Sequence, residues 1–512
     1  MRLPRSSGVL LHPTSLPGEH GIGDLGTEAY RFADFLHESG QRLWQVLPLG
    51  PTGPANSPYQ CYSAHAGNPL LVNLPRLVEE GLLDAAAVES APGFDRASVD
   101  YNSVAQFKEA ALRKASRRFH EGGADYLQAD YVRFCSDNAS WLDDYALFRA
   151  LKEAHNGVSW NQWEESLVRR DADALRSWKD RLARQIEDSM FAQFLFFRQW
   201  RALKDYCRGH GIEIMGDIPI YVAHDSSDVW SHPDLFHLDE KGSPTIVAGV
   251  PPDYFSATGQ YWGNPIYRWD EMASRGYAWW TDRVRAMLSV MDILRIDHFR
   301  GFEAYWVIPA QEKTAVNGHW EPGPRDDLFH AIHNALGQVR LVAENLGLIT
   351  EEVEALRKRF EFPGMGVLQF AFGPDADHSG FLPHEYYPNM VAYTGTHDND
   401  TFIGWWRAEG EDTTMSRSAV KKERNFARKY MATSGKDINW VGIRVVMASV
   451  ADTAIFPLQD ILGLGSEARM NTPGTSGDHN WRWRFAREAL TPNLGERLRE
   501  LTETYGRLPK RG

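Results

Sequence analysis

Short apolar runs recur along the chain and predict buried β-strands. The first run, residues 8–16, is followed by a helical pattern that starts at Thr27 and then by a second run, residues 42–49. The helical segment has apolar residues at the i, i+3, i+4, i+7 spacing of one helix face, namely Ala29, Phe32, Ala33 and Leu36. Strand, helix and strand in this order predict a βαβ unit with parallel strands.

Six more runs have the same apolar, β-rich character. They are residues 213–222, 293–299, 339–344, 366–371, 390–395 and 453–458. With the first two runs, this gives the number of strands that closes a (β/α)₈ barrel, the TIM-barrel fold. An open, doubly wound parallel sheet is the alternative, because both folds alternate strands with helices.

The spacing of the runs is uneven, which predicts insertions. Roughly 160 residues separate the second and third runs, far more than an ordinary strand-to-helix loop. Helical patterns cover residues 105–119, 141–155 and 178–210, and the last of them is expected to lead into the third strand. Residues 70–178 are therefore predicted to form an inserted, mainly helical subdomain.

A second excursion, residues 224–270, is rich in tryptophan and tyrosine and is interpreted as an inserted loop region. About fifty residues follow the eighth run, too few for a separate C-terminal β-sandwich domain. The sequence has no internal repeat and no Ser/Pro-rich linker. We therefore expect residues 1–512 to form a single barrel domain with insertions.

Composition narrows the range of ligands. The chain has 18 Trp, 19 Tyr and 25 Phe, and aromatic residues interleaved with Gly, Pro, Asn and Asp favour stacking on flat ligands such as sugar rings. Core packing is the alternative explanation for about half of them. The net charge of −13 repels phosphate backbones and anionic lipids, so nucleic acid and membranes are not expected partners. No protein partner is inferred.

Cysteine usage predicts a reducing compartment. Only three cysteines occur, and none is in a Cys-x-x-Cys spacing. An odd number argues against a disulfide framework. The first residues lack the apolar run of a signal peptide, and no stretch has the length of a membrane span. A cytoplasmic location is the expectation.

Three acidic residues lie where barrel enzymes place their reactive groups, at the carboxyl ends of strands. Asp297 ends one run, and Arg295, two residues earlier, lies on the same side of the strand. A neighbouring guanidinium keeps a carboxylate ionised, as a nucleophile must be. A structural ion pair is the alternative for these two residues.

The other two acidic residues end the next runs. Glu344 closes an apolar strand, where burial and a neighbouring carboxylate would raise its pKa and suit it to donate a proton. A helix-capping carboxylate is the alternative. Asp398 lies in the polar segment 397–401 just past a strand, where a solvated turn is the alternative to a binding site.

Three carboxylates on three strands indicate glycosidic chemistry, in which one carboxylate attacks and another donates a proton. Other chemistries lack their motifs, because the sequence contains no Gly-x-x-x-x-Gly-Lys loop, no strand-linked Gly-x-Gly-x-x-Gly and no His-Glu-x-x-His pair. The histidines are scattered, which gives a metal site little support.

Segments around these carboxylates resemble those of the amylomaltase family, the 4-α-glucanotransferases also called disproportionating enzymes. The three main segments are residues 295–301, 342–347 and 395–401. Further segments that agree with the family lie in order along almost the whole chain: residues 57–60, 67–69, 216–221, 225–230, 249–255, 262–265 and 466–474.

The resemblance implies a retaining double displacement on α-1,4-glucans and maltooligosaccharides without metal or cofactor. It makes Asp297 the nucleophile, Glu344 the acid and base, and Asp398 the residue that holds ring hydroxyls of the distorted sugar. The substrate-binding positions that it implies are Ser57, Tyr59, Asp217, Tyr254, Trp262, Arg295, His298, His397 and Asn471.

Two functions remain as alternatives to this transferase. An α-glucan hydrolase of the amylase type shares the barrel and the carboxylates, but such amylases usually have Asn-His where this chain has Tyr221 and Val222. A non-catalytic glucan-binding protein would not need the three carboxylates. One further departure is Asn345, which stands where many members of the family have an acidic residue.

Overall fold

Eight parallel strands form the central sheet of the computed structural model, which describes residues 2–252, 256, 258–373, 380–409, 416–475, 477 and 479–509. The strands are β1 (Ser6–Leu10), β2 (Leu43–Gln45), β3 (Glu213–Pro219), β6 (Ile293–Asp297), β9 (Leu341–Ala343), β10 (Gly364–Val367), β11 (Met390–Tyr393) and β12 (Thr453–Pro457). Their order is β10-β11-β12-β1-β2-β3-β6-β9. The Ala343 amide also donates to the Pro363 carbonyl oxygen at 2.9 Å, which links β9 to the segment before β10. The predicted eight-stranded barrel is therefore confirmed as a nearly closed one.

Several predicted strand boundaries need correction: the second run, 42–49, and the third, 213–222, end earlier than predicted, at Gln45 and Pro219, and β1 and β10 show the reason. β1 ends at Leu10 rather than at residue 16, because Pro13 starts a short 3₁₀ helix, Pro13–Ser15. β10 begins at Gly364 and ends at Val367, and the apolar residues that follow form a 3₁₀ helix, Leu368–Phe372. Apolar residues continue past the end of each strand, so hydrophobicity alone did not mark where the strands end.

Side chains of each strand alternate between the barrel interior and the surrounding helices. In β6, Ile293 belongs to the core inside the barrel, with Met215, Val342 and Val391. Leu294 and Ile296 belong instead to the larger core between strands and helices. Arg295 and Asp297 share the side of Ile293, so β6 directs both toward the barrel interior.

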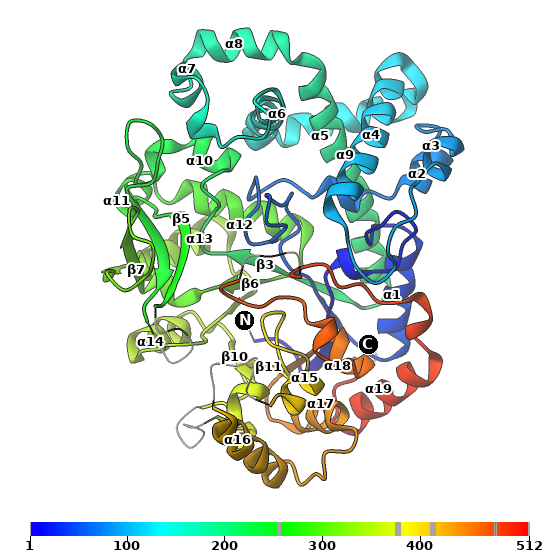
Figure 1. Ribbon diagram of the computed structural model, residues 1–512, viewed down its shortest axis with the longest axis vertical. Coiled ribbons are helices and arrows are strands. Elements are labelled where there is room, and N and C mark those ends of the chain that lie inside the picture. The colour runs from blue at the N-terminus through cyan, green and yellow to red at the C-terminus, as the bar shows by residue number, and fades with distance from the viewer. Residues whose placement is uncertain are drawn as a thin grey trace.

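Helices surround the barrel and lead into its strands (Figure 1). They include α1 (Thr27–Glu38), α9 (Ala183–Gly209), α12 (Ala278–Val290), α13 (Arg325–Leu336), α14 (Glu351–Arg359), α16 (Arg417–Tyr430) and α17 (Ile438–Ala448). The face of α1 that the sequence predicted to be apolar is buried. The predicted helix 178–210 is wrong in one respect: it is not continuous, because Leu182 interrupts it between α8 (Ala172–Arg181) and α9.

A group of helices between β2 and β3 lies at the top of Figure 1. It comprises α2 (Leu74–Glu79), α3 (Ala85–Glu89), α4 (Tyr101–Arg118), α5 (Gln128–Asp137), α6 (Ala139–Ala154), α7 (Glu165–Val168) and α8. Helices α4, α5 and α6 pack against α9, which then enters β3. Helical insertions are thus present, and the exact bounds of an inserted subdomain stay a prediction.

A second, antiparallel sheet lies beside the barrel. Its strands are β4 (Ile246–Val250), β5 (Gln260–Pro265), β7 (Ala304–Pro309) and β8 (His319–Pro322), in the order β5-β4-β7-β8. Two of these strands fall inside the aromatic region 224–270, together with α10 (Ser227–Ser231) and the start of α11 (Trp269–Ser274). The sequence predicts a loop region there and neither of the two strands.

The described residues after β12 form the short helix α18 (Leu458–Leu462), a loop and the final helix α19 (Pro492–Thr504), with no further sheet. Across the described part of the chain, no helix combines the length and apolar character that a membrane crossing requires.

Candidate active site

Arg295 joins two carboxylates at the carboxyl end of the barrel. Its Nη2 lies 2.9 Å from Asp297 Oδ1, and its Nη1 donates to Asp217 Oδ2 at 2.6 Å. The register of β3 and β6 explains this, because Asp217 is the direct partner of Arg295 in the sheet. The guanidinium is buried, and its planar fork is suited to bridging two carboxylates.

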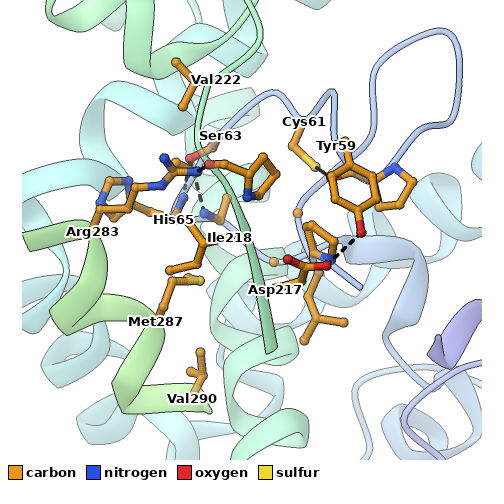
Figure 2. Close-up of a pocket in the computed structure, with 18 of the residues that line it drawn as sticks. Tyr59, Cys61, Ser63, His65, Asp217, Ile218, Val222, Arg283, Met287 and Val290 are labelled. Carbon is orange, nitrogen blue, oxygen red and sulfur yellow. Dashed lines mark hydrogen bonds between the residues drawn. The ribbon is translucent and has the colours of Figure 1, made fainter. Parts of the chain in front are cut away.

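Tyr59 extends this network from the loop that follows β2. Its hydroxyl donates to Asp217 Oδ2 at 2.7 Å, as Figure 2 shows. Burial and the Asp217 carboxylate hold the pKa of Tyr59 well above its usual range, so the phenol stays a hydrogen-bond donor at neutral pH. A cavity behind this pair is lined mainly by apolar side chains, including Ile218 and Met287.

Asp297 is the more exposed of the two bridged carboxylates, with 30% of its side chain accessible. Burial raises its pKa to about 6, against the opposing effect of Arg295. The sequence predicts that Arg295 keeps this carboxylate ionised. Asp297 is still mainly ionised at neutral pH, and Arg295 is the charge that limits the rise.

Glu344 follows the neighbouring strand, β9. Ile296 and Ala343 are sheet partners, so Asp297 and Glu344 are the next residues of two paired strands. Burial, reinforced by the Asp297 carboxylate, raises the pKa of Glu344 to about 7. Glu344, which holds its proton more strongly, therefore lies beside Asp297, which is mainly ionised at neutral pH.

Backbone amides fix the orientation of Glu344. Its Oε2 accepts from the His298 amide at 2.7 Å, and its Oε1 accepts from the Leu346 amide at 3.0 Å. His298 lies in the left-handed region with φ of 54°, which aims its amide at the carboxylate. Each carboxylate oxygen retains a second lone pair, so the group can carry a proton without losing these contacts.

Asn345, the departure from the family pattern, does not contact the Glu344 carboxyl group. Its side-chain amide donates to Glu354 Oε1 at 2.7 Å, and its carbonyl oxygen accepts from the Met365 amide at 2.7 Å. It therefore ties β9 to α14 and β10, and the raised pKa of Glu344 has its causes elsewhere.

Asp398 lies in the segment after β11 and is nearly half exposed, with 45% of its side chain accessible. Its Oδ1 accepts from the Asn471 side-chain amide at 2.7 Å and lies 3.4 Å from His397 Nε2. Its backbone oxygen accepts from Arg469 at 2.7 Å. These contacts hold one edge of the carboxylate and leave the rest of it open.

Aromatic rings connect Asp398 with the Tyr59 network. The ring of His397 stacks on Tyr59 with centroids 5.1 Å apart, and Trp481 lies within 6.0 Å of both rings. The buried Tyr59 hydroxyl bonds Asp217, so the three strand ends of β3, β6 and β11 meet through this contact. The three predicted carboxylates belong to one site.

The remaining predicted binding residues are Trp262, His298, Ser57 and Tyr254. The rings of Trp262 (β5) and His298 are nearly perpendicular with centroids 4.8 Å apart, and burial lowers the pKa of His298 to about 3, so the His298 ring is neutral. Ser57 Oγ accepts from the Tyr59 amide at 3.2 Å and shapes the loop of Tyr59. Tyr254 lies outside the described residues.

Three residues of this site had not been identified as functional from the sequence. Arg469 and Trp481 come from the loop after α18, and His12 follows β1 next to His397. Burial lowers the pKa of His12 to about 3. Arg469 lay within a segment that resembles the family, which was the available signal, whereas His12 and Trp481 have no local pattern that distinguishes them from core residues.

Comparison with known proteins gives concordant results over the full chain. A family model described as 4-alpha-glucanotransferase matches residues 11–490. The 4-alpha-glucanotransferase of Synechocystis sp. is 50% identical to the chain, and the match covers 98% of this chain and 98% of that protein. The 4-alpha-glucanotransferase of Thermus thermophilus is also 50% identical, and the match covers 99% of this chain and 100% of that protein. The solved structure of amylomaltase from Streptococcus agalactiae in complex with acarbose is 39% identical, covers 99% of this chain and 100% of its own, and superposes with a TM-score of 0.93.

Proposed function

The chain belongs to the 4-alpha-glucanotransferase family, and on that premise we propose that Asp297, Glu344 and Asp398 together carry out the transfer reaction. The protein is a 4-alpha-glucanotransferase (amylomaltase), a glycosyltransferase that acts on α-glucans. The finer assignment made here is the transfer of α-1,4-glucan segments to the 4-hydroxyl of a glucose or maltooligosaccharide acceptor.

In the first step, Asp297 attacks the anomeric carbon while the glycosidic bond to the leaving oxygen breaks. Glu344 gives its proton to that oxygen, so the shortened glucan leaves as an alcohol and Glu344 becomes a carboxylate. The sugar is now bound to Asp297 through an ester bond with inverted configuration. Asp398 accepts hydrogen bonds from ring hydroxyls and stabilises the positive charge that develops on the ring.

In the second step, Glu344 takes the proton of the acceptor hydroxyl as the new glycosidic bond forms and the ester bond to Asp297 breaks. A second inversion restores the original configuration, and both carboxyl groups return to their starting states. The observation that carries this proposal is the placement of Asp297 and Glu344 on paired strands with pKa values of about 6 and about 7.

Transfer requires the acceptor to compete with bulk water, which is about 55 M. A bound acceptor reaches a higher effective concentration than this when it is well oriented. Trp262, beside His298, is a candidate surface for holding it. Water that reached the ester bond instead would give hydrolysis.

Product analysis on maltotriose tests this function. Transfer conserves the number of glycosidic bonds, so we expect a ladder of shorter and longer oligomers, free glucose and a constant number of reducing ends. A steady rise in reducing ends would identify a hydrolase. An inactive protein that still binds amylose would identify a glucan-binding protein.

We also propose that the enzyme works in the cytoplasm without a protein partner. Its three cysteines, Cys61, Cys135 and Cys207, are all free, which suits a reducing compartment. The net charge of −13 makes nucleic acid an unfavourable partner.

A further inference from the structure

A loop and its support lie behind Asp398. We call residues 394–402, which connect β11 to helix α15 (Phe402–Arg407), the aspartate loop, because they carry His397 and Asp398. The segment from α18 to Asn471 follows β12, the neighbouring strand, and reaches back across the barrel end to this loop. The two segments are joined by a set of side-chain hydrogen bonds.

Asp460 of α18 binds the two ends of the aspartate loop at once. Its Oδ2 accepts from Thr394 Oγ1 at 2.5 Å, and its Oδ1 accepts from the Phe402 amide at 2.7 Å. Asp460 is 1% exposed, so water cannot substitute for either contact. Its own backbone oxygen accepts from the Asn439 side-chain amide at 2.9 Å, which fixes α18 to α17.

Both oxygens of Asp460 accept a hydrogen bond, and an ionised carboxylate accepts such bonds more strongly than a neutral carboxyl group does. Burial raises the pKa of Asp460 to about 6, and the Phe402 amide and the Thr394 hydroxyl oppose that rise. The carboxylate is therefore mainly ionised at neutral pH. An ionised group this deeply buried is costly, and apolar packing would stabilise the fold at least as well.

The rest of the support acts farther along the same loop. Ser466 Oγ donates to Asp400 Oδ2 at 2.7 Å, and Gln369 donates to the Asp400 backbone oxygen at 2.7 Å. Arg469 and Asn471 then reach Asp398 itself. Asp460 sets where the loop begins and ends, and these contacts set its course in between.

We propose that Asp460 is a positioning residue for the transfer reaction, acting through the aspartate loop to hold Asp398 at the sugar ring. The inference rests on the proposed role of Asp398. Asp460 touches no substrate in this scheme. Its effect is geometric, because a displacement of about 1 Å in a group that stabilises the transition state can cost about 100-fold in rate.

Two variants of Asp460 separate geometry from charge. In Asp460→Ala both loop ends lose their partner, and we expect kcat for maltotriose disproportionation to fall by roughly 10- to 100-fold, with a smaller change in KM. In Asp460→Asn the amide oxygen still accepts from the Phe402 amide, and the amide nitrogen donates to the Thr394 hydroxyl oxygen. This variant should recover most of the lost rate.

A matched pair of threonine variants controls for stability. Thr394 and Thr502 are both fully buried, and Thr502 binds Gln41 and Leu498 far from the site. Thr394→Val and Thr502→Val each remove one buried hydroxyl, so both should lower the melting temperature. Only Thr394→Val should lower kcat per folded enzyme, and this variant tests the inference even if Asp460→Ala does not fold.

The decisive measurement combines Asp460→Ala with Asp398→Asn. If Asp460 acts through Asp398, its removal costs little further rate in the Asp398→Asn background, where the group that it positions is already lost. Equal losses in both backgrounds, or kcat changes that match those of Thr502→Val, overturn the inference. An Asp398→Asn enzyme with the wild-type rate would instead contradict the proposed role of Asp398.

Discussion

The two sides of the active site hold their carboxylates in different ways. At the ends of β6 and β9, burial raises the pKa of both Asp297 and Glu344, the Asp297 carboxylate raises that of Glu344 further, and Arg295 supplies a buried countercharge. On the opposite side, Asp398 is nearly half exposed and is fixed by neutral hydrogen bonds from Asn471 and by the aspartate loop.

The difference follows from what each carboxylate has to do. A group that must exchange a proton or form a bond needs a tuned pKa, which burial and nearby charge provide. A group that only binds hydroxyls can remain in contact with water, and for that group the position matters most. Substitutions on the two sides should therefore differ in size and in their dependence on pH.

Replacement of the nucleophile should have the largest effect. Asp297→Asn keeps the size of the side chain but cannot form the ester bond, so kcat with maltotriose should fall on the order of 10⁴- to 10⁶-fold. The melting temperature should change little by comparison. Disproportionation rates with thermal unfolding of the same samples provide the measurement. A loss of less than about 100-fold would assign the nucleophile to another residue.

Replacement of the acid and base should have the next largest effect and should change the pH profile. In the wild type, kcat/KM should rise as Asp297 loses its proton near pH 6 and fall as Glu344 loses its proton near pH 7. Glu344→Gln should lower the rate with maltotriose by roughly 10²- to 10⁴-fold and remove the alkaline limb.

A glycosyl fluoride donor provides the control for that variant. Fluoride leaves without needing a proton, so Glu344→Gln should still form the ester intermediate from α-maltosyl fluoride. An equal loss with maltotriose and with the fluoride would show that Glu344 does not act as the acid.

Removal of the buried countercharge should have a smaller effect with a defined direction. Arg295 lowers the pKa of Asp297 and of Glu344. Arg295→Gln should therefore shift both limbs of the profile to higher pH and lower kcat by about 100-fold. Arg295→Lys keeps the charge but cannot bridge Asp217 and Asp297, so it should lose rate without the same shift. Profiles that superpose on the wild type would contradict this electrostatic role.

The barrel was predictable because its strands are buried on both sides and appear as apolar runs. The carboxylates were predictable for a related reason, since an acidic residue that ends such a run interrupts the apolar pattern. Strand ends were less accurate, as at β10, because apolar residues continue past Val367 into a 3₁₀ helix.

The antiparallel sheet was missed because its strands are short and because its two central strands, β4 and β7, pair across residues 251–303. The local sequence carries little information about that central pairing. The same limit applies within the site. The alternation of β6 placed Arg295 beside Asp297, but its bond to Asp217 depends on the register of β3 and β6, which no local pattern encodes.

The substitutions with the smallest expected effects give the sharpest comparison. Asn471→Ala and Tyr59→Phe each delete one hydrogen bond, one on each side of the site. Asn471→Ala removes the donor to Asp398, whose exposed carboxylate can bind water instead, so the cost should be only about 0.5–1.5 kcal/mol, roughly two- to tenfold in kcat. Tyr59→Phe removes the donor to Asp217, whose side chain is fully buried, and should cost more because no water replaces it. Both rates are measured at pH 6.5 on maltotriose. A larger loss for Asn471→Ala than for Tyr59→Phe would mean that the exposed side, and not the buried one, depends more on each of its contacts.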